Sequence, residues 1–193
     1  FRRGDGPPHR LVQNTDALET VIQLYSFSKV YRLMGHRIGA IMTSATLLNE
    51  IEKFLDTVTI CATPLGQDAA LFGLEHLTEW VEDQRQVILS KQSIFRQAFT
   101  ELEPLGWRIL GCGAYFAYVS YPFDMIATEF AQRLVEDQHI LALPSDMFVP
   151  VSEHGKHRHL RIAFANIDQS EIEKMVERLT NLPYRLAPPA KGA

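Results

Sequence analysis

The chain has 193 residues, of which 46% are apolar and 22% are charged, and its formal net charge is −4 at pH 7. This composition is typical of a globular protein, and the mildly acidic balance disfavours a protein that binds nucleic acid mainly through charge. No apolar run reaches the roughly 20 residues that span a bilayer. Two cysteines, Cys61 and Cys112, cannot form a disulfide framework, so we expect a cytoplasmic protein without membrane contact.

The first half of the chain predicts two strands followed by helices. Residues 21–25 and 38–43 are short apolar runs, which favours two buried strands. Apolar residues recur at helical spacing from 47 to 58, with Ser44 as a plausible N-cap. Residues 67–103 contain no proline and one glycine. A continuous helix there would reach about 54 Å, so we expect it to pass between two domains or to bend midway.

The rest of the chain alternates strands and helices, which predicts a small α+β unit. Pro104 is expected to end the long helix. Asp168, followed three residues later by Glu171, has the pattern of a capping box. The expected strands cover residues 107–110, 114–121, 139–143 and 159–165, with a turn at 111–113 between the first two, and the expected helices cover 124–138 and 168–182.

One polar segment after the first expected strand carries a single lysine, Lys29. A lysine amine held away from water and near other cations loses its proton more easily and can form an imine with a carbonyl compound. The hydroxyls of Ser26 and Ser28 and the guanidinium of Arg37 suit a phosphate. The same residue types are common in solvated loops, so these residues alone leave both interpretations open.

The motif Ser-Phe-Ser-Lys at residues 26–29, followed by Gly-His-Arg-Ile-Gly, resembles the lysine motif of class I/II aminotransferases. These are fold-type I enzymes that use pyridoxal 5'-phosphate. The resemblance implies that Lys29 is the catalytic residue and holds the cofactor covalently. It also implies that Ser26 and Arg37 hold the cofactor phosphate, with Ser28 nearby.

Two further matches lie downstream. Residues 159–166 resemble the family's strand that presents an arginine to the substrate, which implies that Arg161 grips the α-carboxylate with its planar fork. Arg158 is the nearest alternative and is expected to flank the strand in solvent. Residues 113–116 resemble the strand that brings an aromatic residue near the substrate. Tyr115 is therefore a pocket candidate, with a buried core aromatic as the alternative.

Three more residue patterns bear on the alignment with this family and on the substrate pocket. Residues 63–67 resemble the family's turn before the inter-domain helix. Arg32 departs from the family pattern, in which a small residue is usual. We expect its side chain to face solvent, and a cation added near the phosphate is the alternative. Tyr31, Tyr115 and Phe116 hint that apolar or aromatic substrates are tolerated.

The resemblance covers about residues 11–182 and implies the C-terminal part of an α/β aminotransferase fold. The expected parts are the end of the large-domain mixed or parallel sheet, a long inter-domain helix and a small α+β domain. Their expected limits are residues 1–64, 65–103 and 104–193.

The family also needs an aspartate that pairs with the pyridine nitrogen of the cofactor, farther upstream of the lysine than this chain reaches. Asp5 and Asp16 fall at the wrong places for this role. The chain also begins at Phe1, without a starting Met, in a loop rich in Gly, Pro and Arg over residues 1–10. We therefore expect the C-terminal half of an enzyme, catalytically incomplete alone, whose full-length form is a homodimer.

The implied reaction is transamination between an α-amino acid and a 2-oxo acid, within amino acid metabolism. One alternative is another fold-type I enzyme, such as a lyase or decarboxylase, because the lysine and phosphate contacts are shared across chemistries. Another is the aminotransferase-like sensor domain of a regulator. His154, His157 and His159 lie close in sequence as metal ligands would, but we expect a solvated loop and no metal.

Overall fold

A computed structural model describes residues 9, 11 and 19–187. The chain divides into two compact units, and the boundary falls between Arg85 and Gln86. Asp5, Asp16 and most of the expected loop at residues 1–10 lie outside the described residues, and the expected domain limits at 64 and 103 stay predictions. No helix in the described part of the chain combines the length and the apolar character needed to cross a bilayer.

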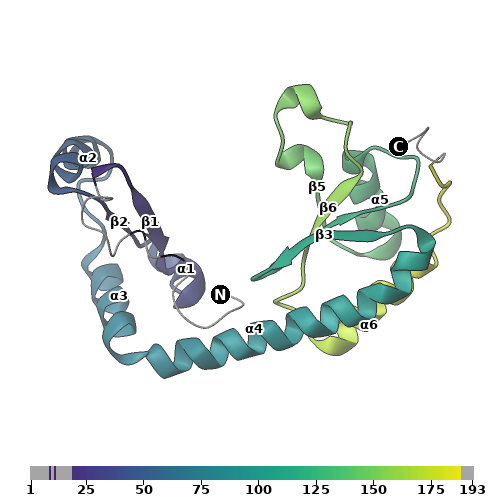
Figure 1. The fold of residues 1–193 in the computed structure, drawn as a ribbon, viewed down its shortest axis with the longest axis horizontal. Helices are drawn as coiled ribbons and strands as arrows, with labels where there is room; N and C mark the ends of the chain where they lie inside the picture. The colour runs from purple at the N-terminus through teal and green to yellow at the C-terminus, as the bar shows by residue number, and fades with distance from the viewer. Residues whose placement is uncertain (1–8, 10, 12–18, 188–193) are drawn as a thin grey trace. The chain divides into compact units, whose positions relative to one another are not determined.

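The described part of the first unit contains one strand pair, three complete α-helices, a 3-10 helix and the beginning of a fourth α-helix (Figure 1). The two strands run antiparallel, with Tyr25 opposite Ala40 and Ser26 opposite Gly39. They lie where the apolar runs predicted them, but the expectation that they are buried is wrong, because no residue of either strand is buried. The elements are β1 (Gln23–Ser26), α1 (Phe27–Val30), β2 (Gly39–Met42), α2 (Ala45–Val58) and α3 (Pro64–His76). Ser44 caps α2 as expected, because its side chain accepts a hydrogen bond from the amide of Leu47.

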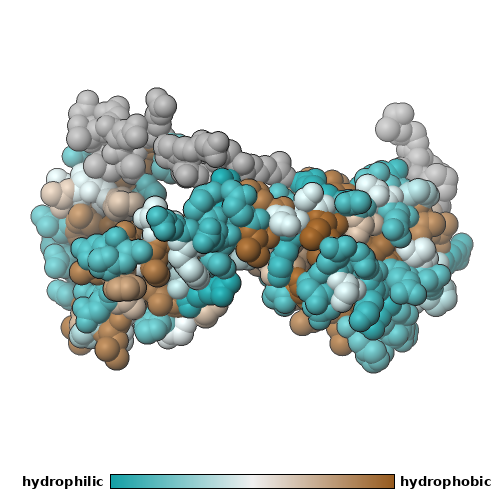
Figure 2. All heavy atoms as spheres, turned by 90° about the horizontal axis from the view of Figure 1, so that it is seen from below, coloured by the Kyte–Doolittle hydropathy of each residue, from teal (hydrophilic) through white to brown (hydrophobic). Residues whose placement is uncertain are grey.

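The core of this first unit is small, and much apolar surface around it is open. Phe27, Ile38 and Ala70 are its buried apolar residues. The left side of Figure 2 shows apolar side chains among the polar ones on this unit. A two-stranded sheet is marginal on its own, so packing against the helices contributes to the stability of this unit. The exposed large side chains include Leu24, Leu48, Phe54, Val58, Ile60, Leu65 and Phe72.

The helical segment expected over residues 67–103 is interrupted midway, which was one of the two expected alternatives, and forms two helices, α3 and α4 (Thr78–Phe99). Leu77 separates them and ends α3 by donating its amide hydrogen bond to the carbonyl of Gly73. The first of these helices begins earlier than expected, because Thr63 caps it and Pro64 occupies its first turn. At the other end, Pro104 sits inside a 3-10 helix over Thr100–Leu105.

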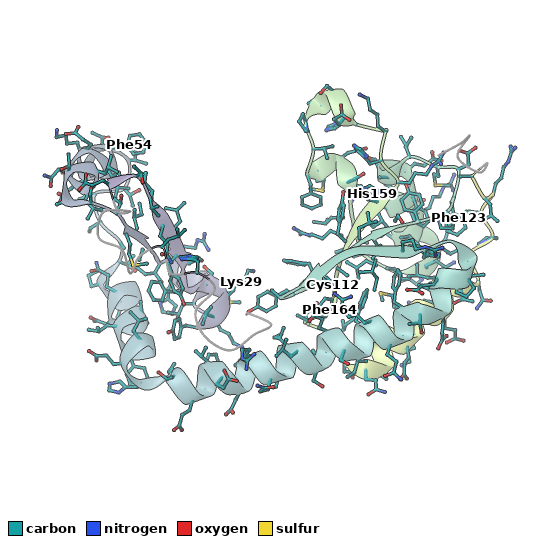
Figure 3. All side chains as sticks on the ribbon, in the orientation of Figure 1. Lys29, Phe54, Cys112, Phe123, His159 and Phe164 are labelled. Atoms are coloured by element: carbon teal, nitrogen blue, oxygen red, sulfur yellow. The ribbon has the colours of Figure 1, made fainter. Side chains whose placement is uncertain are left out.

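The second unit is a four-stranded antiparallel sheet with helices, in the strand order β3-β4-β6-β5. Its core fills one face of the sheet, where Val119 and Leu160 are fully buried, and includes residues of α4, α5 and α6. Figure 3 labels two of its aromatic residues, Phe123 and Phe164. The elements are β3 (Arg108–Gly113), β4 (Phe116–Ser120), α5 (Ala127–Gln138), β5 (Leu143–Pro144), β6 (His159–Ala163) and α6 (Gln169–Thr180).

Two expectations for this unit are wrong and one is confirmed. The turn between β3 and β4 lies at Ala114, which takes a left-handed φ of 46°, and β3 continues through Gly113. In place of the strand expected at 139–143 there is only the two-residue strand β5 (Leu143–Pro144). His139 takes a left-handed φ and ends α5, so the chain is not extended there. The capping box is present, since Asp168 accepts from the amide of Glu171 and the Glu171 carboxylate accepts in return.

Candidate functional site

Lys29 lies on a one-turn helix that follows β1 directly. Ser26 ends β1 in an extended conformation, and its hydroxyl accepts a hydrogen bond from the amide of Ser28 at 3.3 Å. This cap turns the chain from strand to helix within one residue. The Lys29 side chain is exposed, and Figure 3 shows it on α1 beside the end of the strand. The sequence therefore places this amine at a strand end by local backbone chemistry.

Arg37 returns the chain to the same end of the strand pair. Its φ is 53°, and its Nη1 donates a hydrogen bond to the carbonyl of Met34 at 2.9 Å. Two residues later, Gly39 pairs with Ser26 across the ladder. A Cβ at Gly39 would lie 2.9 Å from the carbonyl oxygen of Tyr25, so this close strand approach requires glycine. The fold thus holds the serines, Lys29 and Arg37 on one short loop.

Small residues on α3 support this lysine loop, which we define as residues 26–39. Gly66, Ala70 and Gly73 share one face of the helix and are buried. A Cβ at Gly73 would lie 2.8 Å from Cδ1 of Tyr31, and a Cβ at Gly66 would lie 3.3 Å from the carbonyl oxygen of His36. The helix therefore approaches the loop closely both before and after Arg32. Tyr31 packs against this small core with its ring tilted relative to that of Phe27, at 5.7 Å between ring centres, so the structure gives no support for its expected role in substrate choice.

Gly73→Ala is expected to weaken binding of pyridoxal phosphate about tenfold, because the added methyl group displaces the Tyr31 ring and with it α1. Fluorescence titration of the purified chain with the cofactor measures this change. Gly111→Ala is the control, since a Cβ there meets nothing within 4 Å. Unchanged cofactor affinity in Gly73→Ala would show that this helix does not position the loop.

Arg32 is exposed, as expected from its departure from the family pattern. Its Nη2 donates a hydrogen bond to the side-chain oxygen of Gln84, and its guanidinium lies 5.5 Å from the centre of the Trp80 ring. Both partners belong to α4. The alternative role, an extra cation beside a phosphate, therefore finds no support in these contacts.

Arg161 lies on β6, opposite Tyr118 of β4 and Leu143 of β5. Its Cζ atom is 4.3 Å from the centre of the Phe116 ring and 4.7 Å from the centre of the Phe148 ring. Within residues 19–187, no carboxylate pairs with this guanidinium. Its hydrogen-bond donors are thus available to a ligand with a carboxylate.

Arg158, the alternative to Arg161, already forms an ion pair. Nη2 of Arg158 lies 2.8 Å from Oδ1 of Asp124, and both side chains are about half exposed. An exposed ion pair of this kind is typical of a strand flank. The contrast between the two arginines favours Arg161 as the residue that meets a substrate.

Two titratable neighbours of Arg161 share the sheet face that carries it, and sequence reasoning missed both as site residues. Burial, with a smaller effect from Asp146, raises the pKa of the Tyr118 phenol. Burial, followed by the nearby His157, lowers the pKa of His159, whose ring meets that of Tyr118 at 5.3 Å. Both shifts favour the neutral form. The alternation of side chains along a strand could have indicated both residues. Tyr118 is the strand partner of Arg161, and His159 is two positions from Arg161 on the same strand, so all three side chains share one face of the sheet.

Tyr115 occupies the turn between β3 and β4 and is half-buried rather than part of the core. Its carbonyl accepts a hydrogen bond from the amide of Phe164 at 3.2 Å, and its ring meets that of Phe116 at 6.3 Å. Tyr115 directly precedes Phe116, whose ring contacts Arg161, so Tyr115 lies near Arg161 in the fold. Its substrate role stays a prediction.

The histidine cluster forms local contacts. The rings of His157 and His159 stack at 5.5 Å, and Nε2 of His157 lies 3.5 Å from the Glu153 carboxylate. Across the described ranges, no three His, Cys, Asp or Glu side chains are arranged to hold a metal ion.

The structure brings Ser26, Ser28, Lys29 and Arg37 together in the first unit, and it places Tyr115 and Arg161 in the second. The family described as "Aminotransferase class I and II" matches residues 3–179 of the chain. The chain therefore belongs to the class I and II aminotransferases, which are pyridoxal-phosphate enzymes of fold type I.

Three relatives illustrate this similarity. The aromatic aminotransferase ISS1 of Arabidopsis thaliana is 27% identical over 180 residues, which cover 91% of this chain and 43% of that protein. Transaminase BacF of Bacillus subtilis is 26% identical, with 93% and 44% covered. The solved structure of YbdL from Escherichia coli, whose description identifies a methionine aminotransferase function, superposes with a TM-score of 0.76 at 25% identity, covering 89% and 44%. The chain thus spans less than half the length of these relatives.

Proposed function

We propose that this chain supplies the lysine and the substrate arginine of an aminotransferase that exchanges an amino group between an α-amino acid and a 2-oxo acid. The observation that carries the proposal is the lysine loop, where Lys29 follows a capped strand end beside Ser26, Ser28 and Arg37. Lyases and decarboxylases of the same fold type share such a loop. Family membership favours transamination.

The donors on this loop fit pyridoxal phosphate. Two hydroxyls and a guanidinium can donate charge-assisted hydrogen bonds to a phosphate, and an exposed amine can react with an aldehyde. Ser26, Ser28 and Arg37 would hold the phosphate, and Lys29 would hold the cofactor covalently through Nζ. When bound, the cofactor supplies an electron sink for the negative charge that develops at the substrate Cα.

The chain's own residues supply orientation and proton transfer. Arg161 grips the α-carboxylate through two parallel hydrogen bonds, which fixes how the substrate lies as well as adding binding energy. Once the amine of an incoming amino acid has replaced Lys29 on the cofactor, the free Nζ would take the proton from the substrate Cα and act as a general base. In the same half of the cycle the Lys29 nitrogen would pass this proton to the cofactor as a general acid, and in the second half it would return a proton to the substrate Cα. The cycle predicts ping-pong kinetics.

We also propose that these 193 residues hold only part of the active site, and that the complete enzyme is a cytoplasmic homodimer. The chain spans 43% of the aromatic aminotransferase that it matches. In addition, the large apolar surface and small core of the first unit suggest that further polypeptide covers it.

One experiment tests whether Lys29 binds the cofactor and whether the chain is catalytically incomplete. The purified chain is incubated with pyridoxal phosphate, reduced with borohydride and digested, and we expect a single modified peptide that contains Lys29. With amino donors we expect no sustained turnover. Steady oxo-acid production by this chain alone would contradict its incompleteness. In the complete enzyme, release of carbon dioxide in place of oxo acid would favour a decarboxylase.

A further inference from the structure

We propose that Phe116 and Phe148 are positioning residues that hold the Arg161 guanidinium in the orientation that receives a carboxylate. The inference deepens the proposed function, because it rests on Arg161 as the carboxylate clamp. Sequence reasoning linked Phe116 to substrate choice and gave Phe148 no role. In the structure both aromatic rings contact the arginine.

The two rings reach Arg161 from different elements. Phe116 starts β4 and pairs with Ala163, two residues beyond Arg161 on β6, so its side chain shares the arginine's sheet face. Phe148 follows the 3-10 helix Ser145–Met147. The guanidinium carbon lies over both rings, at 4.3 and 4.7 Å from their centres.

The segment that carries Phe148 is held by hydrogen bonds of its own. The amide of Phe148 donates to the carbonyl of Ser145 at 2.8 Å, and the buried Ser145 hydroxyl donates to the carbonyl of His157 at 3.1 Å. The carboxylate of Asp146 accepts from the hydroxyl of Thr128 and the amide of Gly155, and the Gly155 bond is the main reason that its pKa is lowered. The ring position is therefore set by the fold.

This arrangement suits the chemistry of a guanidinium. Its flat faces are weakly hydrated and are attracted to the negative face of an aromatic ring, while its N–H donors point outward in its plane. Rings that contact the guanidinium carbon restrict the rotation of a long side chain. The in-plane donors remain available, since no carboxylate in residues 19–187 pairs with Arg161. A carboxylate then meets a fork that already has its binding orientation.

The test measures carboxylate binding by the whole chain, without cofactor and without turnover. Pyruvate, a simple 2-oxo acid, is titrated against the chain while the Nε–H signal of Arg161 is followed by NMR. Arg161→Gln identifies that signal. Phe148 is 44% exposed, so Phe148→Leu leaves the core intact. We expect Phe148→Leu to weaken pyruvate binding about fivefold and to move the Arg161 signal, because the ring face is lost.

Two further variants distinguish the possible outcomes. Phe148→Tyr keeps the ring face and is expected to bind pyruvate as the parent does, and so is Phe54→Leu, an exposed control on α2. Unchanged affinity in Phe148→Leu, or equal losses in the leucine and tyrosine variants, would overturn the positioning role. A parent chain in which pyruvate never perturbs the Arg161 signal would instead contradict the proposed carboxylate clamp, and the positioning role with it.

Discussion

Replacing Lys29 with alanine is expected to abolish covalent attachment of pyridoxal phosphate to this chain. Ser26, Ser28 and Arg37 remain to hold the phosphate, so weak reversible binding should persist while the borohydride-fixed adduct disappears from the mass spectrum. In the complete enzyme the same change removes both the covalent anchor and the group that moves the Cα proton. We expect turnover to fall by at least about 10⁴-fold.

Lys53→Ala provides a matched control on the same unit. Lys53 is exposed on α2 and pairs with Glu50 at 2.6 Å, which is typical of a surface ion pair. Its loss should leave the adduct unchanged. A fixed adduct that survives in Lys29→Ala, or that moves with Lys53, would show that the lysine is wrongly assigned.

Replacing Arg161 with glutamine should weaken substrate binding in the complete enzyme by about 3 kcal/mol, or about 150-fold, because two charge-assisted hydrogen bonds to the carboxylate are lost. The effect should appear mainly in KM, since the carboxylate is held in both ground state and transition state. Arg161→Lys should recover little, because a point charge cannot reproduce a planar fork. Steady-state kinetics with an amino acid and with the corresponding amine, which lacks the carboxylate, measure the difference.

Arg158→Gln tests whether the effect belongs to one arginine. Its ion pair with Asp124 is half exposed, so we expect a change below about 1 kcal/mol and no selective loss of carboxylate substrates. If Arg158→Gln raised KM more than Arg161→Gln did, the two assignments would have to be exchanged.

Features fixed by local chemistry were predictable from the sequence. Ser44 caps α2, and Asp168 forms its capping box with Glu171, because both devices depend on residues three positions apart. A bend within residues 67–103 was one of the expected alternatives, but its position at Leu77 is marked by no glycine or proline there and could not be predicted from the spacing of apolar residues. The turn at Ala114 was equally hidden, because an alanine takes the left-handed conformation beside a glycine that stays in the strand.

The candidate site likewise has one part that the sequence could predict and one part that depends on the tertiary fold. Lys29 and its phosphate donors lie within twelve residues of one another, so a motif could indicate them together. The surroundings of Arg161 depend on strand register and on a separate turn. Phe148 is thirteen residues from Arg161 in sequence, and its ring follows a 3-10 helix whose Ser145 hydroxyl donates a hydrogen bond to the carbonyl of His157.

The small-residue face of α3 has a mechanical consequence. Where two elements meet through long side chains, a shift of one can be absorbed by changes of rotamer. At Gly66 and Gly73 the helix has no side chain to yield, so its backbone bears directly on the loop. We therefore expect a displacement of this helix to be passed to Tyr31 and His36, which lie on the loop between Lys29 and Arg37.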